Sequence, residues 1–159
     1  MIKRRIYPVI SFILLVLWLL LIFNMSAKTG EESAGISLIL AKYVYKLPLI
    51  DKIIKFDNLH LLIRKTAHFT EYGILGLLLL NFIKSIGVHI SKKAYITAFI
   101  IGVIYAALDE YHQSFVDGRG PSVIDVFIDS SGVLFFLIMV YLISTRLYER
   151  KKMLSEACS

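Results

Sequence analysis

Ten polar residues between positions 65 and 129 lie inside or at the ends of apolar segments. A charged side chain at the centre of a bilayer costs between about 2.5 and 15 kcal/mol, so intramembrane acids usually face one another or a wet cavity and serve a function. Five of the ten carry carboxylates, which makes them candidates for binding or acid–base chemistry. The candidate site residues are Lys65, His68, Glu71, Asp109, Glu110, His112, Gln113, Arg119, Asp125 and Asp129.

Helical spacing predicts which of these side chains meet. Residues three or four apart lie on one face of a helix, so the candidates form one face on each of three segments. Glu110 is rotated by about 100° from Asp109 and should point at a different neighbour. The three faces are Lys65, His68 and Tyr72, with Glu71 beside His68; Asp109, His112 and Gln113; and Asp125 and Asp129.

The charges of this cluster do not balance. Its five carboxylates meet at most three fixed cations, Arg64, Lys65 and Arg119, while two histidines are adjustable. Two negative charges remain. Either some carboxylates are protonated, or the histidines are cationic, or a cation or amine ligand completes the site.

Simpler structural roles compete with function at several positions. Asp125 can complete a capping box with Ser122. Arg119 is either a solvated residue of the glycine-rich turn 117–121 or an anchor for one of the acids. Lys65 can snorkel to the membrane surface. The residues hardest to explain by structure alone are Asp109, Glu110 and Asp129.

Composition places the chain in a membrane. It has 159 residues, 57% of them hydrophobic and 19% charged, whereas soluble domains have about 45–50% and 25%. The net charge is +6, but the basic residues flank apolar runs as topology signals do, so we expect no nucleic-acid partner. The lone Cys158 excludes a disulfide within the chain.

The sequence predicts an all-α integral membrane helical bundle with four transmembrane helices and an amphipathic outer helix, all within residues 1–145. The first apolar run is too long for a cleaved signal peptide. Ala98, Gly102 and Ala106 allow close helix packing, and Pro121 suits a first helical position. The spans are 6–23, 66–84, 94–116 and 121–144, the outer segment is 33–57, and 146–159 is a basic cytoplasmic tail.

Caps and basic residues refine this arrangement. Ser33 is the expected N-cap of the outer helix, and Asp57 or Asn58 that of the second membrane helix. Lysines and arginines in the short loops favour a cytoplasmic N-terminus and C-terminus. The polar ends of the second, third and fourth spans then share the outer side of the membrane, where an outward-facing pocket is expected.

The order and spacing of the polar motifs resemble the VanZ-like family, small bacterial membrane proteins named for a teicoplanin-resistance protein. The resemblance covers about residues 1–145. It implies a helical bundle in the bacterial cytoplasmic membrane and, for the named member, lowered susceptibility to lipoglycopeptide antibiotics that act on peptidoglycan precursors. It brings no established reaction or cofactor. The matching residues are 64–72, 109–115, Arg119, Asp125, Asp129 and Gly132.

Three functions follow from these residues. The first is a non-enzymatic envelope protein whose pocket binds a membrane lipid, a lipid-linked cell-wall precursor or a lipoglycopeptide headgroup. The second is an intramembrane hydrolase or transferase, with histidines and acids holding a metal, although their spacing matches no specific metal motif. A proton or cation pathway ranks last, because the polar residues gather at one end and the inner half of the bundle, such as 75–80 and 135–142, is apolar and closed to ions. No catalytic residue, metal or cofactor is assigned.

Overall fold

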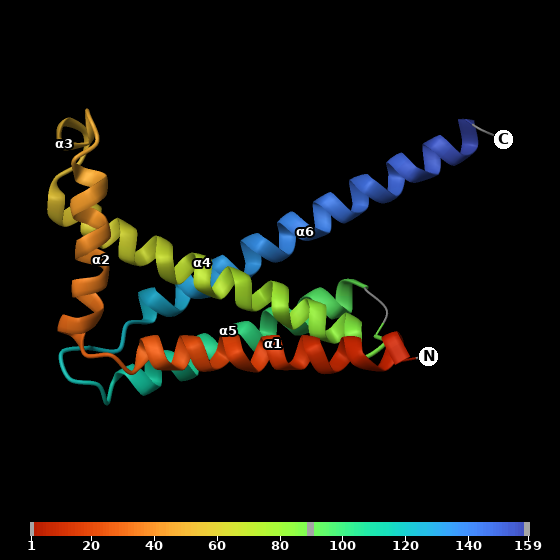
Figure 1. Ribbon diagram of the computed structural model, residues 1–159, viewed down its shortest axis with the longest axis horizontal. Coiled ribbons are helices and arrows are strands. Elements are labelled where there is room, and N and C mark those ends of the chain that lie inside the picture. Colours follow the sequence, from red (N-terminus) through yellow and green to blue (C-terminus); the bar gives the residue numbers. More distant parts are fainter. Residues whose placement is uncertain (1, 89–90, 158–159) are drawn as a thin grey trace.

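Long apolar runs with few charges produce the main helices of this protein. The computed structural model describes residues 2–88 and 91–157 (Figure 1). In that part of the chain, four helices are long and apolar enough to cross a membrane, and no strand occurs, which confirms the predicted all-α membrane bundle. The helices are α1 (Ile2–Ser26), α2 (Gly30–Tyr45), α3 (Ile50–Ile53), α4 (Phe56–Ser85), α5 (Lys92–Gln113) and α6 (Val123–Ala157).

The two ends of the bundle differ in what they carry. Figure 1 shows the N-terminus, the C-terminus, the last turn of α4 and the first turn of α5 toward one end. The other end holds α2, α3 and the connection between α5 and α6. The first half of α6 packs against α4 and α5, and its second half extends away from the bundle (Figure 1).

Small residues let the helices approach closely, as predicted for the third span. Ala98 and Ala106 are fully buried, and a Cβ on Gly102 would lie only 2.9 Å from a methyl group of Val133 on α6. The tightest approach joins α6 to α4, where a Cβ on Gly132 would collide with the backbone of Phe69. These contacts fix the faces of α4, α5 and α6 toward one another.

Two predicted helix starts are wrong. The N-cap of α2 is Thr29, whose hydroxyl accepts a hydrogen bond from the backbone N–H of Glu32 while the Glu32 carboxylate accepts one from the backbone of Thr29. This complete capping box explains why the helix begins before Ser33. α4 begins at Phe56 after Lys55, so neither Asp57 nor its neighbour caps the helix.

The boundaries around the third and fourth spans also differ from the predicted ones. α5 ends at Gln113, and a series of turns replaces the helix expected to reach residue 116. α6 begins at Val123 rather than at Pro121, because Ser122 accepts the first amide hydrogen bonds of the helix. It continues to Ala157 through most of the predicted tail, where no glycine or proline interrupts it. Cys158 lies outside the described residues.

Candidate functional site

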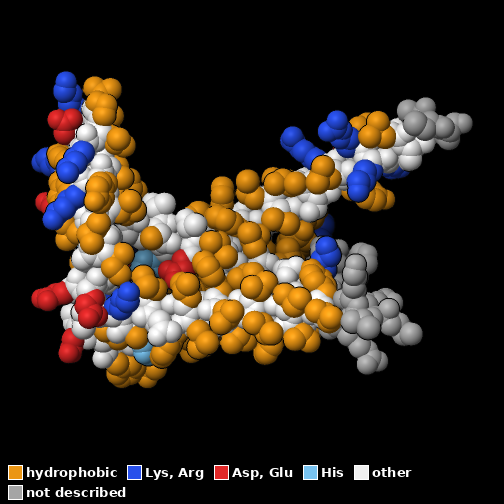
Figure 2. Space-filling model, viewed as in Figure 1, with side chains coloured by type: hydrophobic (Ala, Val, Ile, Leu, Met, Phe, Trp, Pro, Cys, Tyr) orange, Lys and Arg blue, Asp and Glu red, His pale blue; other side chains and the backbone are white. Residues whose placement is uncertain are grey.

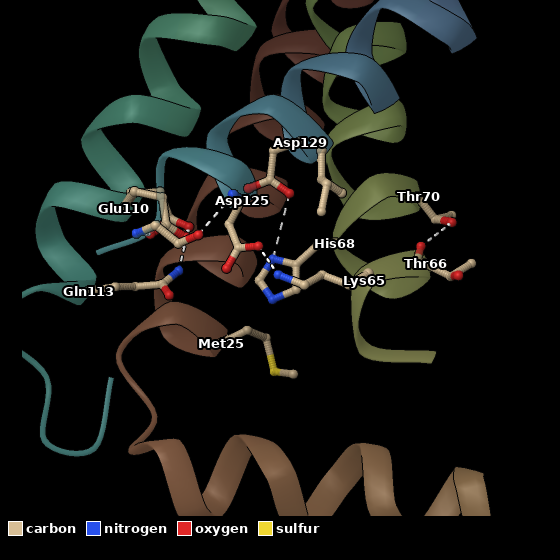
Figure 3. Close-up of polar contacts among 12 residues, drawn as sticks. Met25, Lys65, Thr66, His68, Thr70, Glu110, Gln113, Asp125 and Asp129 are labelled. Atoms are coloured by element: carbon tan, nitrogen blue, oxygen red, sulfur yellow. Dashed lines mark hydrogen bonds and ion pairs between the residues drawn. The ribbon is translucent and has the colours of Figure 1, made fainter. Parts of the chain in front are cut away.

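Two pairs of ionisable side chains join α4 to α6. The ammonium of Lys65 forms an ion pair with the carboxylate of Asp125, and one turn farther on His68 Nδ1 lies 3.7 Å from Asp129 Oδ1 (Figure 3). Asp129 is completely buried. Because both helices advance by three or four residues between the pairs, their predicted polar faces meet in register.

The acids of α5 point in two directions, as the spacing predicted. Gln113 Nε2 donates a hydrogen bond to Asp109 Oδ2 over 3.1 Å. Glu110 Oε2 instead accepts one from the backbone N–H of Ser122 over 2.9 Å, immediately before α6. All three α5 side chains are buried. Glu110 therefore holds the start of α6, whereas Asp109 remains directed toward the interior of the bundle.

Asp125 takes part both in the cap of α6 and in an ion pair with α4. Its backbone N–H donates a 3.2 Å hydrogen bond to Ser122 Oγ, as in a capping box. Its carboxylate, however, binds Lys65 on α4. The reciprocal half of the box is replaced by an ion pair between helices.

Arg119 is neither a freely solvated turn residue nor the direct partner of an acid. Its Nη2 donates a 3.2 Å hydrogen bond to the carbonyl of Met25, near the end of α1. Its Nε and Nη1 are buried and find no hydrogen-bond partner among the described residues. Burial, followed by the charge of Arg64, lowers the pKa of Arg119 from its ordinary value. An arginine nevertheless stays charged in proteins, so Arg119 brings an incompletely satisfied cation to this end of the bundle.

His112 lies apart from the other α5 candidates. Its ring stacks at 40° on Phe23 of α1, with centroids 4.7 Å apart. A position three residues after Asp109 is rotated by about 60° from it, which is enough to turn the imidazole toward α1. The grouping of His112 with Asp109 and Gln113 therefore differs from the observed packing.

A cavity of about 180 Å³ lies among α1, α2, α4, α5 and the turn that follows α5. We call it the polar cavity. Figure 2 shows acidic and histidine side chains surrounded by hydrophobic ones on the visible face of this region. The charged or titratable residues that line the polar cavity are Arg64, His68, Glu71, Asp109 and Arg119. The other candidates, including Lys65, Asp125 and Asp129, do not line it.

The sequence predicts α2 as an amphipathic outer helix, at the interface or over the bundle, but not that it lines a cavity. Ser33 and Ser37 of α2 line the polar cavity, so this helix forms its roof. His60 Nε2 lies 2.7 Å from Ser37 Oγ and ties α2 to α4. The backbone N–H of Gly30 donates a 3.1 Å hydrogen bond to the Asp117 carbonyl. The four-residue spacing of Ser33 and Ser37 places both on one helix face, and this spacing could have indicated a polar surface on α2.

Gly30→Ala is expected to loosen this roof without unfolding the bundle. The added Cβ would collide with the backbone carbonyl of Gly118, so the first turn of α2 must move away from the turn after α5. Amide hydrogen exchange in α2 should accelerate at least tenfold, while that in α5 stays unchanged. Gly35→Ala is the control, because its Cβ meets no atom within 4 Å. Equal α2 exchange in both variants would contradict this role for Gly30.

The donor geometry gives little support to a metal centre. In residues 2–88 and 91–157, no three histidine, cysteine, aspartate or glutamate side chains lie where they could hold one ion. The nearby hydroxyl of Ser114 is exposed and donates to the Tyr111 carbonyl, which leaves it without an activating base.

Comparison with known proteins gives one match. A family model described as VanZ/LLP1 matches residues 11–144, a range that contains all ten candidate site residues and the polar cavity. No curated protein and no solved structure matches the chain.

Proposed function

The chain belongs to the VanZ/LLP1 family, and from this membership we propose that it binds the polar head of a cell-envelope amphiphile in the polar cavity beneath α2. One observation carries the proposal. Buried donors of Arg119 and the buried Oε1 of Glu71 find no hydrogen-bond partners among the described residues, and both side chains line the polar cavity. Buried polar groups are nearly always hydrogen-bonded, so a ligand with both acceptors and donors suits this site.

The proposed orientation places the polar cavity on the outer side of the bacterial cytoplasmic membrane. Both termini lie toward the opposite end of the bundle (Figure 1). Lysines and arginines in short loops favour the cytoplasmic side. The polar cavity would then open near the outer leaflet, where lipid-linked cell-wall precursors and lipoglycopeptides are accessible.

Binding has more support than catalysis. Apolar side chains such as Ile22, Ile36 and Leu40 line the polar cavity together with the charged ones, and this mixture suits recognition of an amphiphile. The alternative of a hydrolase or transferase requires a nucleophile or a metal-activated water. Among the described residues, no three histidine, cysteine, aspartate or glutamate side chains come together to hold a metal, and the Ser114 hydroxyl donates to a backbone carbonyl.

We further propose that binding alters susceptibility to teicoplanin and related lipoglycopeptides. A strain that lacks the gene should show at least a fourfold change in the minimal inhibitory concentration, and the wild-type gene should restore the original value. Asp109→Asn should fail to restore it at equal protein level, because the substitution removes a carboxylate charge that lines the polar cavity.

The matched control for this experiment is Asp51→Asn. It makes the same chemical change at an exposed position of α3, outside the polar cavity, and should restore susceptibility fully. Restoration by Asp109→Asn as well, or no effect of deleting the gene, would refute the proposed role in susceptibility.

A further inference from the structure

The polar cavity continues into an apolar groove between α1 and α4. This groove, of about 730 Å³, shares Met25, Leu40, Ile63, Ala67 and Glu71 with the polar cavity. It extends along α4 from Leu62 to Ile74, about 18 Å at 1.5 Å per residue. We call it the α1–α4 groove. A ligand whose head occupies the polar cavity therefore has an apolar path leading away from it along the spanning helices.

The α4 wall of the groove is built from small side chains at helical spacing. Thr66, Ala67 and Thr70 lie between the larger Ile63 and Ile74, which leaves room beside α4. Figure 3 shows Thr66 and Thr70 on the side of α4 away from His68. Both threonine hydroxyls donate 2.8 Å hydrogen bonds to carbonyls four residues earlier. They therefore have no unused donor to oppose a hydrocarbon chain.

The opposite wall comes from Trp18, Leu21 and Met25 of α1. The indole N–H of Trp18 donates a 3.0 Å hydrogen bond to the Glu71 carbonyl, so the ring is held at the groove with its polar atom satisfied. Trp18 is the only tryptophan in the chain. Its fluorescence can therefore report directly on the occupant of the groove.

The head of the groove carries charges of both signs. Arg64 and Arg119 line the polar cavity, and neither forms an ion pair within the described part of the chain. Glu71 lies seven residues beyond Arg64 along α4, about 10 Å deeper into the bundle at 1.5 Å per residue. Glu71 and Asp109 line the same cavity as the two arginines. Two cations and two carboxylates around one cavity suit a head with one anionic and one cationic group.

We propose that the ligand is a zwitterionic phospholipid. This inference rests on the proposed function and specifies its ligand. The phosphate contacts Arg64 and Arg119, the amine faces Glu71 and Asp109, and one acyl chain lies in the α1–α4 groove. Arginine is suited to phosphate through its planar set of N–H donors, and each buried methylene of the chain adds to affinity.

Quenching of Trp18 by brominated lipids tests this assignment in full-length protein held in an uncharged detergent. Phosphatidylethanolamine with a brominated acyl chain should quench saturably. Brominated diacylglycerol, which lacks phosphate and amine, should bind at least tenfold more weakly, and brominated phosphatidylglycerol, which lacks the amine, at least threefold more weakly. Phosphoethanolamine without chains should displace the lipid only at a concentration at least a hundredfold higher.

Variants separate the chain site from the head site. Thr70→Phe fills the α1–α4 groove without reaching the polar cavity and should weaken quenching at least tenfold. Thr97→Phe, the same change at an exposed position of α5, should leave it unchanged. Arg119→Gln should remove the preference for phosphatidylethanolamine over diacylglycerol.

Equal binding of the three lipids, or normal binding by Thr70→Phe, would overturn the phospholipid assignment. Either result leaves the broader proposal intact if the susceptibility effect of Asp109→Asn persists. If Asp109→Asn instead restores susceptibility fully while the wild-type protein binds the lipids as expected, the role in susceptibility is refuted and the phospholipid site stands.

Discussion

Gly132→Ala is expected to lower the free energy of unfolding by about 3 kcal/mol, near the upper end of the usual cost of overpacking. The new Cβ would collide with the backbone carbonyl of Phe69, and a backbone cannot rotate away as a flexible side chain can. α6 must then separate from α4 at the level of His68 and Asp129. Unfolding in detergent, followed by circular dichroism, measures the change.

Gly35→Ala makes the same change on α2, where the added Cβ meets nothing within 4 Å. It should stabilise the protein slightly, since alanine is favoured over glycine in a helix by about 1 kcal/mol. If Gly132→Ala unfolds at the same denaturant concentration as wild type, the close approach of α4 and α6 is wrong, and with it the geometry of the Lys65–Asp125 and His68–Asp129 pairs.

Asp129→Arg is expected to cost about 4 kcal/mol, which is the scale for leaving an uncompensated charge in a protein interior. Asp129 is completely buried, and the new cation would lie beside His68 and within electrostatic reach of Lys65. Little folded protein should accumulate in the membrane. Size-exclusion chromatography of extracted protein measures the amount of folded protein, and the unfolding curve in detergent measures the free energy of unfolding.

Asp129→Asn provides the matched comparison. Neither Asp129 oxygen accepts a hydrogen bond from the described residues, and the amide is nearly the same size as the carboxylate. The free energy of unfolding should therefore stay within about 1 kcal/mol of wild type, because no hydrogen bond and little packing is lost. Equal stability of the arginine and asparagine variants would mean that position 129 is not enclosed by the bundle.

Much of the architecture follows from the sequence because lipid imposes simple rules. Uncharged apolar runs give the spans, and the cost of polar groups in hydrocarbon directs Asp109 and Asp129 inward. Helical spacing then predicts the meeting of α4 with α6 and the separate direction of Glu110. The family resemblance seen in the motifs is borne out by the match over residues 11–144.

The remaining features depend on tertiary contacts that spacing cannot fix. The polar cavity needs α2 as its roof, and this position depends on the close approach of Gly30 to Gly118 and on the contact between His60 and Ser37. The use of Arg119 to hold the end of α1 has no local signal. The prediction that His112 shares a face with Asp109 is wrong, because residues three apart on a helix are rotated by about 60° and can contact different neighbours.

Native mass spectrometry of protein extracted with its lipids can show whether the polar cavity holds the head of an envelope amphiphile. We expect one bound amphiphile per wild-type protein, retained by Asp51→Asn and lost from Asp109→Asn and Arg119→Gln at equal folded yield. Wild-type protein that carries no bound amphiphile, or equal retention by all four proteins, would refute binding in the polar cavity.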